Sequence, residues 1–247
     1  MIYNKKYDDT NISDILIYSK KLEGKTFKEV LRDDIKDDDE YKKSIAYYNN
    51  TRSKGGLGNL LEKYYYGYEI NNNPKADFIK ANCELKTTPL KMVKNDFKAK
   101  ERLVLSMIPN NRSIKNDLFN SELIEKIENI LLVFYYHDKN IKDNRTSYQI
   151  KYVNLYNLFN DKKDLDVIAN DYKIITNKII RGKAHELSEK DTKYLSACTK
   201  GNNAKGSIRP QYYNPDIPAK SRAFSFKALY INKIIKNIEK ERLILDK

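Results

Sequence analysis

The longest uninterrupted apolar run in this chain covers residues 130–136 and is seven residues long. A helix needs about 20 apolar residues to cross a bilayer, so this run is too short to span a membrane. Its β-branched and aromatic residues indicate a strand instead. Runs of the same kind predict further strands at residues 77–79, 83–88, 102–108 and 148–155.

Apolar residues recur at helical spacing on both sides of these predicted strands. Thr26 and Glu29 form a capping-box pattern that predicts the start of a short helix. Residues 33–43 are dense in charge and predict either a loop or an exposed helix. We expect helices at residues 11–22, 26–31, 54–66, 121–129, 165–179 and 229–245. Helices around a central mixed sheet predict one α/β (α+β) domain over residues 1–247, with a cleft between two lobes that the sequence does not delimit.

The composition excludes a disordered chain, because 40% of the 247 residues are hydrophobic, and 20 are Tyr and 8 are Phe. The net charge of +13 attracts polyanions such as nucleic acids, although a solvated basic surface with no such partner has the same charge. Two cysteines make no disulfide framework, and the amino terminus has no apolar signal segment. We therefore expect a cytoplasmic protein.

The pattern with the clearest chemistry consists of Asp77, Glu84 and Lys86. Six residues separate the two carboxylates, and one residue separates Glu84 from Lys86. Side chains alternate between the two faces of a strand, so Glu84 and Lys86 share one side. Two carboxylates can hold a hard divalent cation such as Mg²⁺ through their oxygens. The neighbouring ammonium can orient a water for attack on phosphorus, and the cation then stabilises the developing negative charge. This is the D…ExK arrangement of restriction-type nucleases.

The same spacing occurs a second time, at Asp33, Glu40 and Lys42. That copy lies in a run of acidic residues with no apolar strand behind it, so we expect its carboxylates to face water. The copy at residues 77–86 lies in a strand context, between apolar residues and a Thr-Thr-Pro sequence. A surface ion pair remains the alternative interpretation of that copy.

Several motifs together resemble the MutH/Sau-three-A family of GATC-specific DNA endonucleases. The similarity runs in the same order over residues 12–235, which is most of the chain. The segments that carry it are 54–62 (KGGLGNLLE), 76–78 (ADF), 84–89 (ELKTTP), 100–105 (KERLVL), 182–189 (GKAHELSE), 198–204 (CTKGNNA) and 222–225 (RAFS). The resemblance implies a restriction-endonuclease-like (PD-(D/E)xK) core whose two lobes surround a DNA cleft.

The resemblance also implies roles for residues of the catalytic site. Asp77 and Glu84 correspond to the metal-binding carboxylates, and Lys86 to the residue that positions the attacking water. Glu62 corresponds to a further acidic residue that supports the metal, and Lys126 to an active-site lysine that contacts phosphate. Without the resemblance, Glu62 and Lys126 would be interpreted as exposed helix residues.

Five residues are implied to contact DNA. Lys54 precedes the Gly-Gly pair as the family's DNA-contacting lysine does. Thr199 and Lys200 belong to a segment that resembles the loop that reads bases in the major groove, where lysine can donate to O6 and N7 of guanine. Arg222 and Lys227 are candidates for phosphate contacts, which position a protein on DNA and give salt-sensitive affinity.

Two departures from the family pattern bear on function. Ser225 stands where the mismatch-repair enzyme has a tyrosine that senses adenine methylation, which favours a restriction enzyme. The restriction relatives also carry a further carboxy-terminal DNA-binding domain, so this sequence is either a single-domain enzyme or the catalytic part of a longer one.

The resemblance implies a Mg²⁺-dependent type II restriction endonuclease that cuts double-stranded DNA at GATC, 5′ to the guanine. Its functional partner would be a methyltransferase that protects host DNA, and dimerisation on DNA is one route to double-strand cleavage. The alternatives are a MutH-like nicking endonuclease of mismatch repair and a non-catalytic DNA-binding effector module.

Overall fold

The structure is a computed structural model, and it describes residues 6–50, 56–68, 75–200 and 208–245. The chain divides into two compact units, each built from separate stretches of sequence. The first comprises Met1–Lys100, Asn129–Tyr156 and Ile238–Lys247, and the second comprises Glu101–Glu128 and Asn157–Asn237. The fold is therefore a mixed α+β arrangement in which the chain passes between the units four times.

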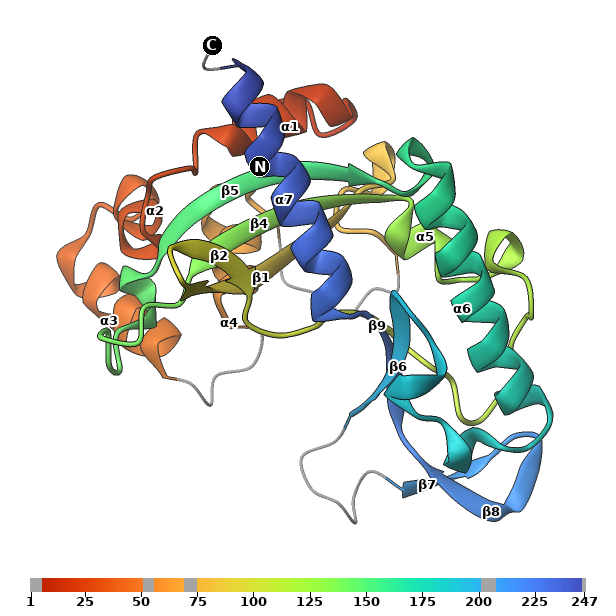
Figure 1. The fold of residues 1–247 in the computed structure, drawn as a ribbon. Helices are drawn as coiled ribbons and strands as arrows, with labels where there is room; N and C mark the ends of the chain where they lie inside the picture. Colours follow the sequence, from red (N-terminus) through yellow and green to blue (C-terminus); the bar gives the residue numbers. More distant parts are fainter. Residues whose placement is uncertain (1–5, 51–55, 69–74, 201–207, 246–247) are drawn as a thin grey trace. The chain divides into compact units, whose positions relative to one another are not determined.

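The first unit is built on a four-stranded mixed sheet of order β2-β1-β4-β5 (Figure 1). Strand β1 pairs parallel with β4 and antiparallel with β2, and Leu85 of β1 lies opposite Leu131 of β4. The strands are β1 (Glu84–Val93), β2 (Asp96–Ala99), β4 (Asn129–Tyr136) and β5 (Gln149–Asn157). The predicted mixed sheet is confirmed.

Helices from the amino-terminal part of the chain pack against one face of this sheet. Their apolar side chains form one buried core with Leu85, Val133 and Ile150 of the strands. The capping box of Thr26 and Glu29 is present, with the Thr26 N–H donating to Glu29 Oε2 at 2.7 Å. The helices are α1 (Ile12–Lys20), α2 (Phe27–Asp34), α3 (Asp38–Asn49) and α4 (Gly56–Leu60), the last continued by the π-helical turn η1 (Leu61–Tyr65).

The second unit is built on a three-stranded antiparallel sheet of order β3-β9-β6. Helix α6 (Lys162–Ile180) packs on this sheet, where Tyr172 stacks on Phe224 with ring centroids 5.3 Å apart. The buried carboxylate of Asp171 accepts three backbone N–H groups just before and at the start of β6. The other elements are β3 (Leu103–Met107), α5 (Ile124–Ile127), β6 (Leu195–Thr199), the hairpin of β7 (Ile208–Gln211) and β8 (Asn214–Lys220), and β9 (Arg222–Phe226).

The last helix, α7 (Ala228–Leu245), begins in the second unit and ends in the first. Within the first unit its Arg242 pairs with Glu23 at 2.5 Å, and its Glu239 accepts a hydrogen bond from the hydroxyl of Tyr152 at 3.0 Å.

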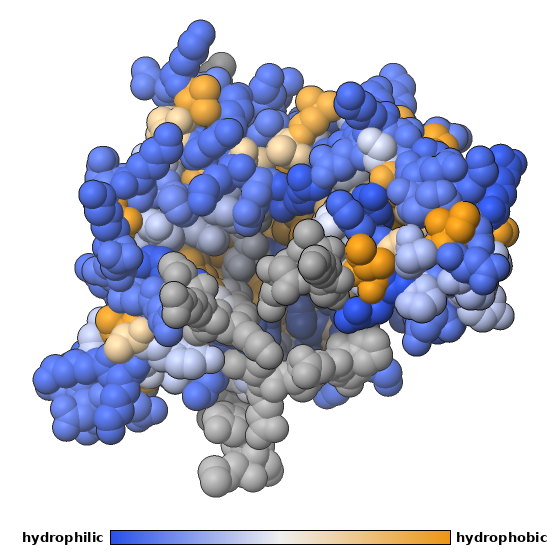
Figure 2. Space-filling view, turned by 90° about the horizontal axis from the view of Figure 1, so that it is seen from below, coloured by the Kyte–Doolittle hydropathy of each residue, from blue (hydrophilic) through white to orange (hydrophobic). Residues whose placement is uncertain are grey.

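Hydrophilic residues predominate on the face shown in Figure 2, with apolar residues scattered among them. None of the helices described has the combination of length and apolar character that crossing a membrane requires.

The predicted elements differ from the structure at two places. Residues 77–79 do not form a strand, because the chain turns tightly there into a 3₁₀ helix at Ile79–Ala81. The helix predicted at residues 121–129 is reduced to α5, since a separate 3₁₀ turn (Leu118–Asn120) precedes it. The charged segment 33–43 contains the end of α2 and the start of α3, which the buried Tyr48 anchors to the core.

Candidate active site

The residues between Asp77 and Glu84 form a narrow turn at the start of β1. Phe78 and Cys83 exchange both backbone hydrogen bonds, of 2.9 and 3.2 Å, and Asn82 adopts the left-handed conformation with φ 45°. The turn brings Asp77 beside the first residues of β1, where its Oδ2 atom accepts the N–H of Leu85 at 2.8 Å. The six-residue spacing of the sequence pattern is the length that closes this turn.

Glu84 and Lys86 lie on the same side of β1, as the alternation of a strand predicts. The Nζ atom of Lys86 is 2.5 Å from Oε1 of Glu84, and the two side chains are 22% and 5% exposed. Removing two charges from water is costly, so an ion pair this deeply placed is weak support for a purely stabilising role. The alternative of a surface ion pair is wrong.

The second copy of the spacing behaves as expected. The side chain of Asp33 is 62% exposed and pairs with Lys25, and that of Lys42 is 78% exposed. Glu40 is also exposed, at the amino-terminal end of α3. Burial in a strand thus separates the two copies, although their spacing is identical.

Glu62 is presented by the π-helical turn η1 and is half-buried. The pKa of Glu62 is raised to about 7, chiefly by burial and also by the negative charge of Asp77, whereas the positive charge of Lys86 acts to lower it. Glu84 makes a smaller contribution that also raises this pKa. These electrostatic interactions show that the structure brings four predicted site residues together: Glu62, Asp77, Glu84 and Lys86.

Asp77 and Glu84 provide the donors that suit a divalent cation. Mg²⁺ prefers carboxylate oxygens and usually keeps several waters when one or two carboxylates hold it. Burial raises the pKa of the neighbouring Cys83 to about 12, so its thiol stays neutral and is no competing ligand. Over residues 6–50, 56–68, 75–200 and 208–245, no three histidine, cysteine, aspartate or glutamate side chains form a group that could hold a metal ion. The donor set therefore fits a cation held by two carboxylates, and Glu62 does not complete a three-ligand cluster with them.

The contact that holds α4 against β1 could not be predicted from the sequence. A Cβ atom on Gly58 would lie 3.3 Å from Oγ1 of Thr87, the residue after Lys86. Glycine therefore lets the helix that leads to Glu62 approach the strand that carries Glu84. The glycines of segment 54–62 were the available signal, but their partner on β1 is visible only in the fold.

Three of the predicted DNA-contacting residues lie together at one end of the β6–β9 pair in the second unit. Thr199 is exposed and lies opposite Arg222 in the register, and the N–H of Lys200 donates to Ser221 O at 2.8 Å. The segment that continues from Lys200, residues 201–207, lies outside the described residues. The structure therefore places the beginning of the predicted base-reading loop and no more of it.

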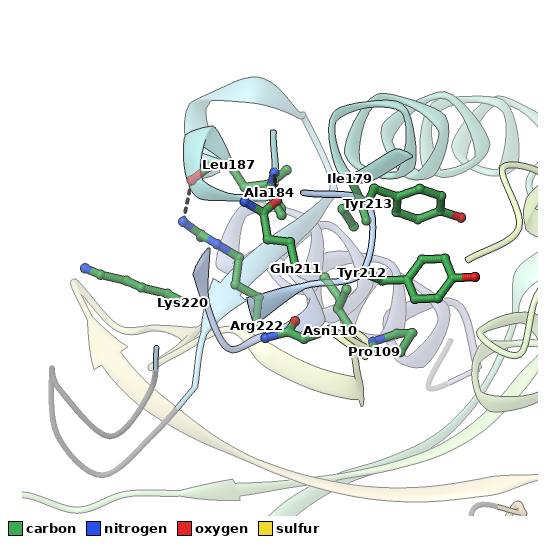
Figure 3. A pocket seen from close by; sticks show the side chains of 11 residues that line it. Pro109, Asn110, Ile179, Ala184, Leu187, Gln211, Tyr212, Tyr213, Lys220 and Arg222 are labelled. Atoms are coloured by element: carbon green, nitrogen blue, oxygen red, sulfur yellow. Dashed lines mark hydrogen bonds between the residues drawn. The ribbon is translucent and has the colours of Figure 1, made fainter. Parts of the chain in front are cut away.

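Arg222 lines a recess of the second unit, shown in Figure 3, beside Gln211 of the β7–β8 hairpin. Its Nη1 and Nη2 atoms donate to the carbonyl oxygens of Ala197 and Leu187, at 2.8 and 2.5 Å. Burial lowers the pKa of this guanidinium. Arg222 thus joins β9 to the chain before β6, and its predicted phosphate contact would have to be made in addition.

The remaining predicted residues are not placed at one site. Lys227 follows the other end of β9, and its ammonium donates to the carbonyl oxygens of Glu189 and Thr192. Lys126 is half-buried in α5 of the second unit. Lys54 lies outside the described residues. Phosphate contacts by these lysines stay predictions.

Two comparisons place the chain among known proteins. Residues 66–171 match the family described as the DNA mismatch repair enzyme MutH. The chain is also 40% identical over 187 residues to the type II restriction enzyme Sau3AI of Staphylococcus aureus. That match covers 75% of this chain and 37% of the relative, so the chain spans well under half of the relative's length. The matched family, the identity and the arrangement of Asp77 and Lys86 around the buried Glu84 agree: this chain belongs to the MutH/Sau3AI family.

Proposed function

We propose that this chain is a Mg²⁺-dependent, site-specific DNA endonuclease that hydrolyses phosphodiester bonds at GATC, 5′ to the guanine. The observation that carries the proposal is the buried ion pair of Glu84 and Lys86 beside the Asp77 carboxylate. Family membership supports the same activity and a restriction-endonuclease-like core. In the proposal, the two lobes surround a DNA cleft.

In this reaction, the residues of the first unit act on a water and on the scissile phosphate. Asp77 and Glu84 would hold Mg²⁺, and the chemistry that the bound cation supplies is stabilisation of negative charge on the phosphate oxygens. The Lys86 ammonium, fixed by Glu84, orients the water that attacks phosphorus. The bond to the 3′ oxygen breaks, which leaves a 5′-phosphate and a 3′-hydroxyl. Glu62, with a pKa of about 7, can accept a proton at neutral pH.

In the second unit, Lys200 and Thr199 would read bases. Lys54, Lys126 and the net charge of +13 would favour contact with the DNA backbone. Thr199 ends strand β6, whose position is fixed by its pairing with β9, and Lys200 follows it. A rigid strand before a polar loop is a suitable support for base contacts, since the loop then begins from a defined point.

Ser225 favours a restriction enzyme over a repair nickase. Its side chain is fully buried, and its hydroxyl lies 3.0 Å from that of Ser196 on the neighbouring strand. A side chain in this position has no access to an adenine methyl group. We therefore propose a restriction role with a methyltransferase as functional partner, and double-strand cleavage by two copies of the enzyme or by sequential nicking.

The experiment that tests the proposal is digestion of supercoiled plasmid with Mg²⁺, using Dam-methylated and unmethylated preparations, followed by sequencing of the ends. Linear products that end at GATC are expected, and an equal rate on both preparations would agree with the buried Ser225. Nicked circles alone would favour the repair-type nickase. Binding to GATC duplexes without any Mg²⁺-dependent cleavage would contradict the enzymatic proposal and favour a DNA-binding effector module.

A further inference from the structure

The turn that presents Glu62 has an unusual backbone. In η1 the N–H of Tyr66 donates to Leu61 O at 2.9 Å, five residues earlier, and the N–H of Tyr68 donates to Glu62 O at 2.8 Å. Single π-helical turns are rare and occur frequently at functional sites. An α-helical continuation of α4 would bond each N–H to the carbonyl oxygen four residues earlier, instead of five for Tyr66 and six for Tyr68, and would point Glu62 in another direction.

Helix α1 holds this turn from the side of the core through a reciprocal pair of tyrosines. The hydroxyl of Tyr65 donates to the carbonyl oxygen of Tyr18 at 2.7 Å, and the hydroxyl of Tyr18 donates to the carbonyl oxygen of Tyr65 at 3.3 Å. Their rings are stacked, with centroids 4.6 Å apart and planes 25° apart. Two hydrogen bonds and a ring contact therefore fix the last residue of the π-turn to α1.

A second set of hydroxyl bonds holds the next residue. The hydroxyl of Tyr66 donates to Ser19 Oγ at 2.7 Å, and Ser19 Oγ donates to Ile15 O at 2.6 Å within α1. The carbonyl oxygen of Tyr66 accepts the hydroxyl of Tyr7 at 3.1 Å. Tyr66 is 2% exposed, so water cannot replace these partners. We call the hydroxyl bonds of Tyr7, Tyr18, Tyr65 and Tyr66 the tyrosine lock.

The tyrosine lock acts on the part of the chain that decides where Glu62 points. Its bonds end on residues 65 and 66, which complete the wide turn that begins next to Glu62. On the other side, the close approach of Gly58 to Thr87 sets the distance between α4 and β1. Glu62 is therefore held between two fixed points, one on α1 and one on the strand of Glu84 and Lys86.

We propose that the tyrosine lock positions Glu62 next to the two carboxylates that would hold Mg²⁺, where its negative charge supports cation binding and cleavage, with Tyr65 and Tyr66 as positioning residues that act through the π-turn. The inference rests on the proposed function, because it places Glu62 beside the proposed metal site. The two tyrosines touch neither substrate nor metal, and packing alone would require their rings but not their hydroxyl groups.

The test replaces each hydroxyl and keeps each ring, in Tyr65→Phe and Tyr66→Phe. Binding of MnCl₂ to the DNA-free protein is measured by titration calorimetry, and kcat and KM are measured on a GATC duplex. Loss of one buried hydroxyl bond, worth about 1 kcal/mol, is expected to weaken Mn²⁺ binding about fivefold. We expect kcat to fall with little change in KM, because the DNA-contacting residues are untouched. Tyr172→Phe is the matched control, since it removes a hydroxyl bond of 2.8 Å to Lys115 O in the second unit.

A double-mutant cycle separates positioning from general stability. If the tyrosines act through Glu62, Tyr65→Phe should have no further effect on Mn²⁺ affinity in a Glu62→Gln background. An unchanged Mn²⁺ affinity in both single tyrosine variants would overturn the inference, as would an undiminished effect in the Glu62→Gln background. Glu84→Ala distinguishes failure of the proposed function from failure of the tyrosine lock. If Glu84→Ala keeps full cleavage, the proposed function is wrong. If Glu84→Ala loses cleavage but Tyr65→Phe behaves as the wild type, only the role of the tyrosine lock is wrong.

Discussion

The carboxylate of Asp77 accepts the backbone N–H of Leu85 at 2.8 Å, across the turn that joins it to β1. One acidic side chain thus fixes the first residues of the strand that carries Glu84 and Lys86. The same carboxylate raises the pKa of Glu62 by charge repulsion. Asp77 therefore has two roles, a hydrogen bond to the backbone and a charge that acts on Glu62. One substitution can remove the charge and keep the hydrogen bond.

Asp77→Asn keeps an oxygen that accepts the Leu85 N–H but removes the charge. We expect loss of Mg²⁺-dependent cleavage with a melting temperature close to that of the wild type, because the turn remains bonded. Thermal unfolding and plasmid digestion measure the two effects. A large fall in melting temperature would mean that the charge itself holds the turn.

Glu84→Ala and Lys86→Ala should each abolish cleavage while GATC duplex binding survives. Each change removes a charged hydrogen bond between the two side chains, so a loss of stability of about 1.5–3 kcal/mol is also expected. The second copy of the spacing supplies the matched controls: Glu40→Ala and Lys42→Ala remove exposed side chains and should leave cleavage unchanged. Substantial cleavage by both β1 variants would remove this site assignment.

The raised pKa of Glu62 predicts a pH effect on the metal-free protein. Glu62 titrates at about 7 in the folded chain and near 4.5 when unfolded, so between these values the folded state binds more protons. The contribution of neutral Glu62 to the free energy of unfolding is therefore fully present below pH 4.5 and is lost as the pH rises through 7. Urea unfolding in EDTA at several pH values should show this decline.

Glu62→Gln supplies the comparison, because its amide does not titrate. The difference in unfolding free energy between the wild type and Glu62→Gln should change across this pH window. A constant difference would mean that Glu62 is ionised throughout. In the wild type, Mg²⁺ affinity should rise over the same window, since deprotonation of Glu62 adds a negative charge beside the two carboxylates that would hold the cation.

Much of this site could be predicted from the sequence, because its residues follow local rules. The shared side of Glu84 and Lys86 follows from strand alternation, and the exposure of Glu40 and Lys42 follows from their acidic surroundings. The turn at residues 77–84 was wrongly predicted to begin as a strand. Phe78 is apolar because it pairs with Cys83 and fills the core, which a local pattern does not distinguish from a strand residue.

Other features depend on contacts between distant segments. Strands β6 and β9 of the second unit were not predicted, because they bury small residues such as Ser196 and Ser225, whose low hydrophobicity gives no alternating pattern. The π-turn at Glu62 reads as an ordinary helix in the sequence. Its hydroxyl partners lie on α1, 47 residues away along the chain.

Gly58→Ala should lower stability by forcing α4 away from β1. The new Cβ would lie 3.3 Å from Thr87 Oγ1, which is tighter than ordinary packing, and overpacking of this kind costs about 1–3 kcal/mol. Thermal unfolding should show a lower melting temperature and digestion a lower cleavage rate. Adding Thr87→Ala removes the Oγ1 atom that the new Cβ would contact. The double variant should therefore recover much of the melting temperature and of the cleavage rate. Failure to recover would mean that helix α4 is displaced by something other than Thr87.

Lys200→Ala should relax sequence recognition without affecting the chemistry of cleavage. The backbone of Lys200 is fixed by its N–H bond to Ser221, so the substitution removes the side chain but not the start of the loop. Loss of a base contact costs about 1–3 kcal/mol of discrimination, which predicts roughly a 5- to 150-fold smaller preference for GATC over sequences that differ at one base pair. Competition binding against such duplexes measures this preference.

Lys173→Ala is the matched control, because Lys173 is an exposed lysine of α6 in the same unit. It removes the same charge and should weaken binding to all duplexes equally or not at all. Equal discrimination by the two variants would show that Lys200 contributes charge rather than base recognition.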